Sequence, residues 1–440
     1  MLKTLKVAVS DLDVGMYVSS LDRSWLDTPF LTQGFFIETQ DDITQLREFC
    51  EFVYVDSRRT SDKLKSPARR ALEKVDRSQR KRGAAGGRRA KAPLETRPRI
   101  PLEKIFADRK LKPYADQRAW EEEHPRAQRA LNALIGDIDD IYTQVHDGDR
   151  LNMVKLRKSV EPLVDTVSSN PDACLWVSRL KQHDQYTYQH SLGAAILAVC
   201  MGRQMGLQRY DLRSLAMGCM LMDIGKLRLA PELLRSDREL TEEETAEVAQ
   251  HVDHGLEILD ECGVLNQDVI DIVAHHHERY DGSGYPEGRY GDGIPAFARI
   301  AAIVDTYDAV TSQRHYADAV SPTDAIKILY SARDEDFQAE LVEAFIRAIG
   351  IYPAGTLVEL TTGEVGVVVA EYRTRRLRPK VLLLLNAQKE KLVRTRIVDL
   401  QKEPAGHDGS QVKIARSLEP EAYGIDLSGI GTAGMQQASA

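Results

Sequence analysis

Apolar residues recur at helical spacing through the middle of the chain. From about residue 125 they fall at i, i+3, i+4 and i+7 in four runs: ALNALIGDIDDIYTQV, LRKSVEPLVDTV, SLGAAILAVCMGRQMG and EEETAEVAQHVDHGLEILDECG. Thr241 followed by Glu244 is the capping-box signal of a helix start, and Gly206 and Gly263 mark helix ends. This pattern predicts a mainly α-helical bundle over residues 125–350.

Strand patterns lie on either side of the bundle. Over residues 1–57, KVAV, GMYVSSL and EFVYVD have strand composition and DDITQLREFC suits a short helix, which predicts a small α/β module. This module shows no catalytic constellation, and we interpret it as a docking or sensing unit. Residues 351–402 contain four expected short strands, TLVEL, EVGVVVAEY, KVLLLLN and KLVRTRIVDL. The chain is therefore expected to be multidomain, with a helical bundle between an α/β module and a short β-rich segment.

Charge is concentrated between the first two domains. Residues 61–112 contain 18 Lys and Arg against 6 Asp and Glu, with very few aromatics. Such a segment buries too little apolar surface to fold alone, so we expect a disordered basic linker over residues 58–124. Its simplest role is a solvated tether, and contact with nucleic acid or an anionic membrane surface is the alternative. A Gly-, Ser-, Ala- and Gln-rich tail over residues 403–440 is also expected to be disordered.

Composition limits the function classes. The 440 residues are 42% hydrophobic and 29% charged, as in ordinary globular proteins, and the net charge of −8 gives no whole-chain case for a nucleic-acid partner. Five scattered cysteines without C-x-x-C spacing indicate reduced thiols and a cytoplasmic location. The longest apolar stretch, residues 192–202, is too short to span a membrane, and acidic residues come too early for a signal peptide.

Histidines and aspartates give the chain its candidate chemistry. Seven of the eleven histidines lie between His183 and His277, several of them beside acids. Each one alone has a structural explanation, such as a hydrogen-bonded core histidine or a solvated helix end. Together they form an ordered set on separate helices, which a bundle can bring to one cavity. The set is His190, Asp223, His251, His276, His277 and Asp305. Mixed nitrogen and oxygen ligands suit Fe, Mn or Zn, and a carboxylate able to bridge two ions, here Asp223, indicates a binuclear hydrolytic site.

Four segments resemble one known family. They are MDIGK (222–226), HVDHG (251–255), HHERYDGSGYP (276–286) and RIAAIVDTYDAVTSQRHY (299–316), and they resemble the HD-GYP phosphodiesterases, a branch of the HD hydrolases. The resemblance covers residues 171–348, and HHE-x-x-DGSGYP is its most specific part. The phrase DLDVGMYV near the N-terminus resembles the domain called DUF3391 that precedes HD-GYP in many bacterial proteins.

The resemblance implies two divalent metal ions, with Fe or Mn preferred. One ion would be held by His190, Asp223 and Asp305, and the other by His251, His276 and His277, with Asp223 bridging. Lys226 would hold a phosphate oxygen and act with Asp223 in catalysis, and Arg314 would grip the same diester. Gly284, Tyr285 and Pro286 would lie at the pocket mouth, where Tyr285 would stack on guanine or dock a partner. The alternative for this loop is a rigid turn that only shapes the cavity.

Three positions depart from the family pattern. Met222 stands where the family has the His of its HD pair, and a thioether is a weak ligand for these cations, so the first metal site is weakened. Tyr186 replaces an acid that some members place before the first His, which argues against a third metal. Ala317 replaces a basic residue that would contact phosphate.

These residues lead to two functional hypotheses. The first is metal-dependent hydrolysis of cyclic di-GMP, a bacterial second messenger that controls biofilm formation, motility and virulence. Its product would be linear pGpG, or GMP if both bonds are cleaved. The second is a degenerate receptor or scaffold that binds the nucleotide, or a diguanylate cyclase (GGDEF) protein through the GYP loop, without hydrolysis.

Overall fold

The computed structural model describes residues 4–23, 28, 35–37, 39–56, 100–179, 186–234, 236, 238, 240–312, 319–371, 377–402 and 412–427. The chain divides into two compact units, Met1–Arg99 and Ile100–Ala440, and each is described by itself. Within the described ranges, every helix is too short or too polar to span a lipid bilayer.

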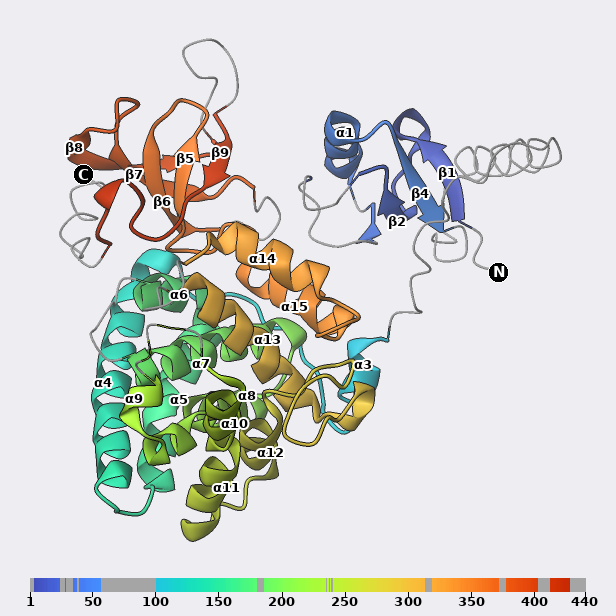
Figure 1. The fold of residues 1–440 in the computed structure, drawn as a ribbon. Helices are drawn as coiled ribbons and strands as arrows, with labels where there is room; N and C mark the ends of the chain where they lie inside the picture. The colour runs from blue at the N-terminus through green and yellow to red at the C-terminus, as the bar shows by residue number, and fades with distance from the viewer. Residues whose placement is uncertain are drawn as a thin grey trace. The chain divides into compact units, whose positions relative to one another are not determined.

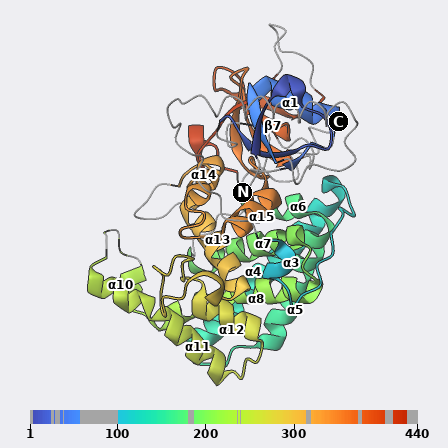
Figure 2. The ribbon, with the colours of Figure 1, turned by 90° about the vertical axis from the view of Figure 1, so that its right-hand side faces the viewer.

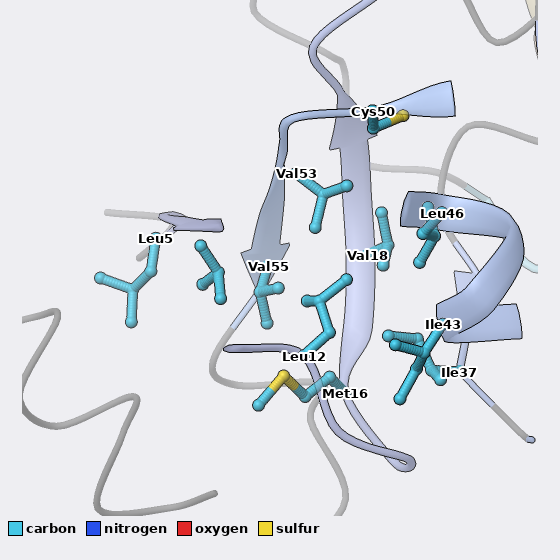
Figure 3. Packing of buried hydrophobic residues seen from close by; sticks show 11 residues of the cluster. Leu5, Leu12, Met16, Val18, Ile37, Ile43, Leu46, Cys50, Val53 and Val55 are labelled. Carbon is cyan, nitrogen blue, oxygen red and sulfur yellow. The ribbon is translucent and has the colours of Figure 1, made fainter. Parts of the chain in front are cut away.

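The first unit is a four-stranded antiparallel sheet with one helix. Its strands are β1 (Thr4–Ala8), β2 (Tyr17–Leu21), β3 (Phe35–Phe36) and β4 (Phe52–Asp56), in the order β1-β4-β2-β3. The helix α1 (Gln40–Phe49) begins with a capping box between Thr39 and Asp42. Alternate residues of the strands, among them Val18 and Val55, pack with Ile43 of α1 in one buried cluster (Figure 3). The predicted α/β module is confirmed.

The second unit is mainly helical, as the periodicity predicted (Figure 1). Its helices are α3 (Leu102–Ile105), α4 (Trp120–His146), α5 (Met153–Ser169), α6 (Pro171–Arg179), α7 (Tyr186–Met205), α8 (Arg209–Leu221), α9 (Pro231–Leu234), α10 (Glu242–Ala249), α11 (His251–Glu261), α12 (Gln267–His275), α13 (Ala296–Thr311), α14 (Pro322–Ser331) and α15 (Ala339–Ile349).

Two helices form the centre of this bundle. The helix α7 packs against α5, α8, α13 and α15, and α13 also contacts α12 and α14. Almost every described residue of both helices is buried, which is typical of helices that are apolar on all sides. The few ionisable residues inside them, such as His190 and Asp305, therefore need partners.

The run of residues 242–263 is two helices and not the single helix that its apolar period predicted. The capping box of Thr241 and Glu244 does begin α10 as expected, but α10 ends at Ala249 and α11 begins at His251. At the junction the Gln250 N–H bonds to the Glu247 carbonyl three residues back, which tightens the turn. The break places His251 in the first turn of α11.

The C-terminal part is a five-stranded antiparallel sheet in the order β8-β7-β6-β5-β9. The strands are β5 (Leu357–Leu360), β6 (Val365–Ala370), β7 (Lys380–Leu385), β8 (Lys391–Asp399) and β9 (Ile414–Ser417). Both views show the sheet beyond α6 and α15 (Figures 1 and 2), and β6 contacts α6. The fifth strand corrects the expectation of a disordered tail over residues 403–440. Val412 and Ile414 join the sheet core, and β9 pairs with β5.

The expected C-terminal boundary of the linker over residues 58–124 is also wrong, because the folded unit begins at Ile100. From Ile100 the chain belongs to the helical unit: Phe106 is buried against Phe297, and Trp120 begins α4. Arg109 pairs with the carboxylates of Asp211 and Asp268, at 2.6 Å for the latter. The prediction used the average charge of the whole segment, and this average does not reveal the apolar and ion-paired residues at its C-terminal end. Only residues 58–99 of the expected linker lie outside the described ranges.

We expect Arg109→Ala to destabilise the helical unit by roughly 2–3 kcal/mol, because it removes charged hydrogen bonds and leaves the buried carboxylate of Asp211 unpaired. Urea unfolding of the full chain, followed by helical circular dichroism, measures this change. Arg228 pairs with Glu257 and Glu261 at the surface, so Arg228→Ala is the matched control and should cost less than about 1 kcal/mol. Equal losses in the two variants would contradict the assignment of residues 100–119 to the fold.

Candidate metal centre and active site

Asp223 lies in a tight turn after α8. The apolar residues 217–222 are buried, and Asp223 begins the 3₁₀ helix Ile224–Arg228 with only 2% of its surface exposed. The turn lies directly against α11 at Gly225. Any other residue there would carry a Cβ that overlaps the carbonyl oxygen of His251 and the backbone nitrogen of Gly255. The Gly after Asp-Ile is thus required by a close backbone approach, which places the Asp223 carboxylate next to His251.

Three histidines surround this carboxylate. His251 comes from the first turn of α11, and His276 and His277 follow the end of α12. The Nε2 atoms of His251 and His276 are 3.4 Å apart, and they lie 3.5 and 3.8 Å from Asp223 Oδ1. Ligand atoms of all four residues lie within 4.8 Å of one another. In the described part of the chain, this is the one cluster of three or more such residues.

Backbone hydrogen bonds fix the orientation of two of these imidazoles. The Nδ1–H of His251 donates to the Val248 carbonyl at 2.7 Å, and that of His276 donates to the Val273 carbonyl at 3.1 Å. A carbonyl oxygen can only accept, so each Nε2 carries a lone pair directed into the cluster. A second hydrogen bond of this kind is typical of metal-binding histidines.

The protonation states of these four residues are also those in which such groups bind a metal ion. Burial lowers the pKa of His276 to about 4 and lowers the pKa values of His251 and His277. Burial would raise the pKa of Asp223, but the charge of Lys226, with smaller contributions from nearby imidazoles, holds it well below its usual range. At neutral pH the cluster therefore offers three neutral imidazoles and one carboxylate, the forms in which these groups bind a metal.

The distances fit one divalent ion. Two donors that each lie about 2.1 Å from the same ion can be at most ~4.2 Å apart. All three measured separations among His251, His276 and Asp223 are shorter than this limit. Lys226 Nζ lies 2.9 Å from Asp223 Oδ1, so the cluster has a cation at its edge.

His190 lies in a different arrangement. Its Nε2 is 2.7 Å from Asp305 Oδ1 and its Nδ1 is 2.8 Å from Asp308 Oδ2. Burial would lower the pKa of His190, but the hydrogen bonds to both carboxylates raise it to about 10. The same pair holds the pKa of Asp305 well below its usual range, against the effect of burial. His190 and Asp305 are not among the four residues of the cluster around Asp223, and the expected ligand set His190, Asp223 and Asp305 stays a prediction.

The GYP loop closes over His277. The ring of Tyr285 stacks on His277 with a centroid distance of 4.7 Å and an interplanar angle of 22°. Gly284 is required here, since a Cβ would overlap the backbone of Arg279 and of His277. Pro286 follows at the surface. Buried Glu278 accepts hydrogen bonds from the N–H groups of residues 287 and 289, which fixes the far side of the loop.

Sequence reasoning did not single out several residues that shape the site. They are Asp308, Glu278 and Gly193, which lies where a Cβ would overlap the Asp308 carboxylate. The i, i+3 spacing of Asp305 and Asp308 on one buried helix was a signal for the first. Arg314, Ala317 and the side chain of Tyr186 lie outside the described residues.

Three family models match the chain. An HD domain matches residues 171–341, a domain of unknown function (DUF3391) matches residues 4–156, and a KOW domain associated with HD domain matches residues 357–424. The DUF3391 match passes the expected module end at residue 57 and includes α4 and the start of α5.

Named relatives cover the chain to different extents. Cyclic di-GMP phosphodiesterase PA4108 of Pseudomonas aeruginosa is 30% identical over 421 residues, which is 95% of this chain and 93% of that protein. The cyclic di-GMP phosphodiesterase response regulator RpfG of Xanthomonas campestris is 36% identical over 34% of this chain and 40% of its own length. The 3′3′-cGAMP-specific phosphodiesterase 2 of Vibrio cholerae is 30% identical over 44% of this chain and 36% of its own length.

We expect Asp223→Ala to weaken Mn²⁺ binding by more than about 100-fold. Loss of a hydrogen bond that orients a metal ligand costs about 10–100-fold in affinity, and this change removes a candidate ligand itself. Isothermal titration calorimetry on the metal-free full chain measures the affinity. Asp253 is an exposed carboxylate on α11, so Asp253→Ala is the control and should bind like the wild type. Unchanged affinity in Asp223→Ala would exclude Asp223 as a ligand.

The metal-free protein should lose stability as the pH falls from 6.5 to 4. The pKa of His276 is about 4 in the folded chain, below the ordinary value of 6.5, so the unfolded chain binds its proton first. The free energy of unfolding should drop by about 3 kcal/mol from this residue over that window. Urea unfolding in the presence of EDTA at several pH values tests this. His276→Gln should show a smaller drop, and an unchanged slope in the variant would contradict the assigned protonation.

Proposed function

The chain belongs to the HD-GYP family of HD-domain hydrolases. We propose that it hydrolyses the phosphodiester bonds of cyclic di-GMP. The observation that carries the proposal is the buried cluster of Asp223, His251, His276 and His277 with Lys226 at its edge. The alignment over 95% of the chain with a relative named a cyclic di-GMP phosphodiesterase supports the choice of nucleotide. The relative named for 3′3′-cGAMP matches a smaller share of the chain.

The four clustered residues would hold the metal ion. Fe or Mn is the proposed ion, because imidazole suits Fe and carboxylate oxygen suits Mn. Such an ion supplies Lewis acidity toward a phosphoryl oxygen and makes its bound water acidic. Asp223 and the three neutral imidazoles provide the donors, and the Val248 and Val273 carbonyls keep the imidazoles oriented. Tyr285 restrains the ring of His277 by stacking on it.

Lys226 is the proposed partner of the substrate phosphate. Its ammonium lies 2.9 Å from Asp223 Oδ1, and its side chain is 23% exposed, so it can be reached from solvent. A protonated amine donates to a nonbridging phosphate oxygen and offsets the charge that develops there during cleavage. The first product would be linear pGpG, and a second cleavage would give GMP. Arg314, Gly284, Tyr285 and Pro286 are proposed as further contacts to the nucleotide.

A second candidate function uses the same cluster of residues. Met222 is fully buried next to Asp223 and replaces an imidazole of the family pattern, which favours a receptor that binds the nucleotide without cleaving it. Such a receptor could act on a diguanylate cyclase through the GYP loop. The discriminating experiment is a turnover assay of the full chain loaded with Mn²⁺, or with Fe²⁺ without oxygen. Chromatography would follow cyclic di-GMP and 3′3′-cGAMP. Metal-dependent formation of pGpG supports hydrolysis, and tight nucleotide binding without product supports the receptor.

Lys226→Met should lower kcat for cyclic di-GMP by about 100-fold, because one donor to the developing phosphate charge is lost. Metal affinity should remain within a few-fold, since the ammonium is not a ligand. Lys327 is an exposed lysine paired with Asp324 on α14, and Lys327→Met is the matched control with unchanged kcat. If Lys226→Met retained full activity, another group would have to contact the phosphate.

A further inference from the structure

We infer that Tyr142 is a positioning residue of this site, and that a hydrogen bond from its hydroxyl holds the turn of Asp223 in place. The inference rests on the proposed function, because it concerns the metal centre proposed there. Tyr142 lies on α4, before the residues 171–341 that match the HD domain and within the residues 4–156 that match DUF3391. The support of the site therefore extends beyond the HD domain.

The hydroxyl of Tyr142 is bonded to the end of α8. It donates to the carbonyl oxygen of Met220 at 2.7 Å, and both residues are buried. Met220 lies in the last turn of α8, where carbonyl groups have no partner within the helix, and it stands shortly before Asp223 in the chain. Burial, with a further contribution from the charge of Asp223, raises the pKa of the Tyr142 phenol. The hydroxyl therefore keeps its hydrogen and remains a donor at neutral pH.

The same hydroxyl reaches a second helix of the site. Ser191 is fully buried on α7, directly after His190, and it is also a hydrogen-bond partner of the Tyr142 hydroxyl. Because the hydrogen of Tyr142 is given to Met220, the serine donates and the phenol oxygen accepts. One side chain of α4 thus joins the end of α8, which leads into Asp223, to the part of α7 that carries His190. The helix α4 also contacts the 3₁₀ helix that follows Asp223.

The position of this turn matters because metal binding leaves it little freedom. Asp223 Oδ1 lies 3.5 and 3.8 Å from the Nε2 atoms of His251 and His276, and ligands of one ion can be at most ~4.2 Å apart. An outward shift of the turn by about 0.5 Å would exceed this limit for His276. The bond from Tyr142 to Met220 opposes such a shift, and its loss should therefore weaken metal binding.

Titration of the metal-free full chain with Mn²⁺ tests the inference without a turnover assay. Tyr142→Phe keeps the buried ring and removes only the hydroxyl, and it should bind Mn²⁺ about 10-fold more weakly, as when other contacts that orient a metal ligand are lost. Tyr114 donates in the same way to the Leu207 carbonyl at 3.0 Å, just before α8 begins, so Tyr114→Phe is the matched control. The control should lose a similar amount of stability in urea and bind Mn²⁺ like the wild type.

Wild-type affinity in Tyr142→Phe, or an equal loss of affinity in Tyr114→Phe, would overturn the inference. Where Tyr142→Phe fails to fold, Ser191→Ala decides, because it removes the second partner of the hydroxyl. It should also weaken Mn²⁺ binding, and an unchanged affinity would contradict the inference.

The outcomes also separate this inference from the proposed function. A 10-fold loss of Mn²⁺ affinity in Tyr142→Phe, with no cleavage of cyclic di-GMP by the wild type, would refute the phosphodiesterase activity and leave this inference standing. Cleavage by the wild type, with unchanged Mn²⁺ affinity in Tyr142→Phe, would do the reverse. A wild-type chain that binds no Mn²⁺ would refute both.

Discussion

The carboxylate of Asp223 is buried at the centre of the helical unit, and the neighbouring structure is arranged around the cost of burying it. An isolated charge in such a place is strongly unfavourable, so it must be paired or bound to a metal. Lys226 supplies an ion pair at 2.9 Å, and three imidazoles turn toward the same carboxylate. These contacts are possible because Gly225 allows the turn to touch α11, whose first residue is His251.

Buried histidines within one bundle take opposite charge states. His276 donates only to backbone carbonyls, and burial therefore dominates and keeps it neutral. His190 is equally enclosed, but two carboxylates outweigh burial and keep it protonated. The neutral rings present lone pairs and the charged ring presents hydrogens, so burial alone does not identify a ligand. The partner of each nitrogen decides whether a histidine is a donor or an acceptor.

The sequence was sufficient for the domain order, because that order depends on local pattern, and its candidate ligands include all four residues of the cluster. The helical period located the bundle, and the clustered histidines pointed to Asp223, His251, His276 and His277. It could not show that His190 faces Asp308, since that contact depends on α7 and α13 packing at Gly193. It also could not show that β9 pairs with β5 across 53 or more intervening residues, or that Arg109 meets Asp211 and Asp268. The average charge of a segment does not reveal single residues within it that pair with residues far away in the sequence.

The effect of Met222 on the site depends on which helices and turns carry the four clustered residues. Met222 is fully buried and continues the apolar packing of α8 up to Asp223. His251, His276 and His277 belong to α11 and to the end of α12, and the close approach at Gly225 and Gly255 holds α11 to Asp223. Exchange of an imidazole for a thioether at 222 therefore leaves this donor set complete, while His190 keeps both of its carboxylates. The imidazoles of the cluster come from α11 and from the end of α12, and its carboxylate comes from the turn that directly follows Met222.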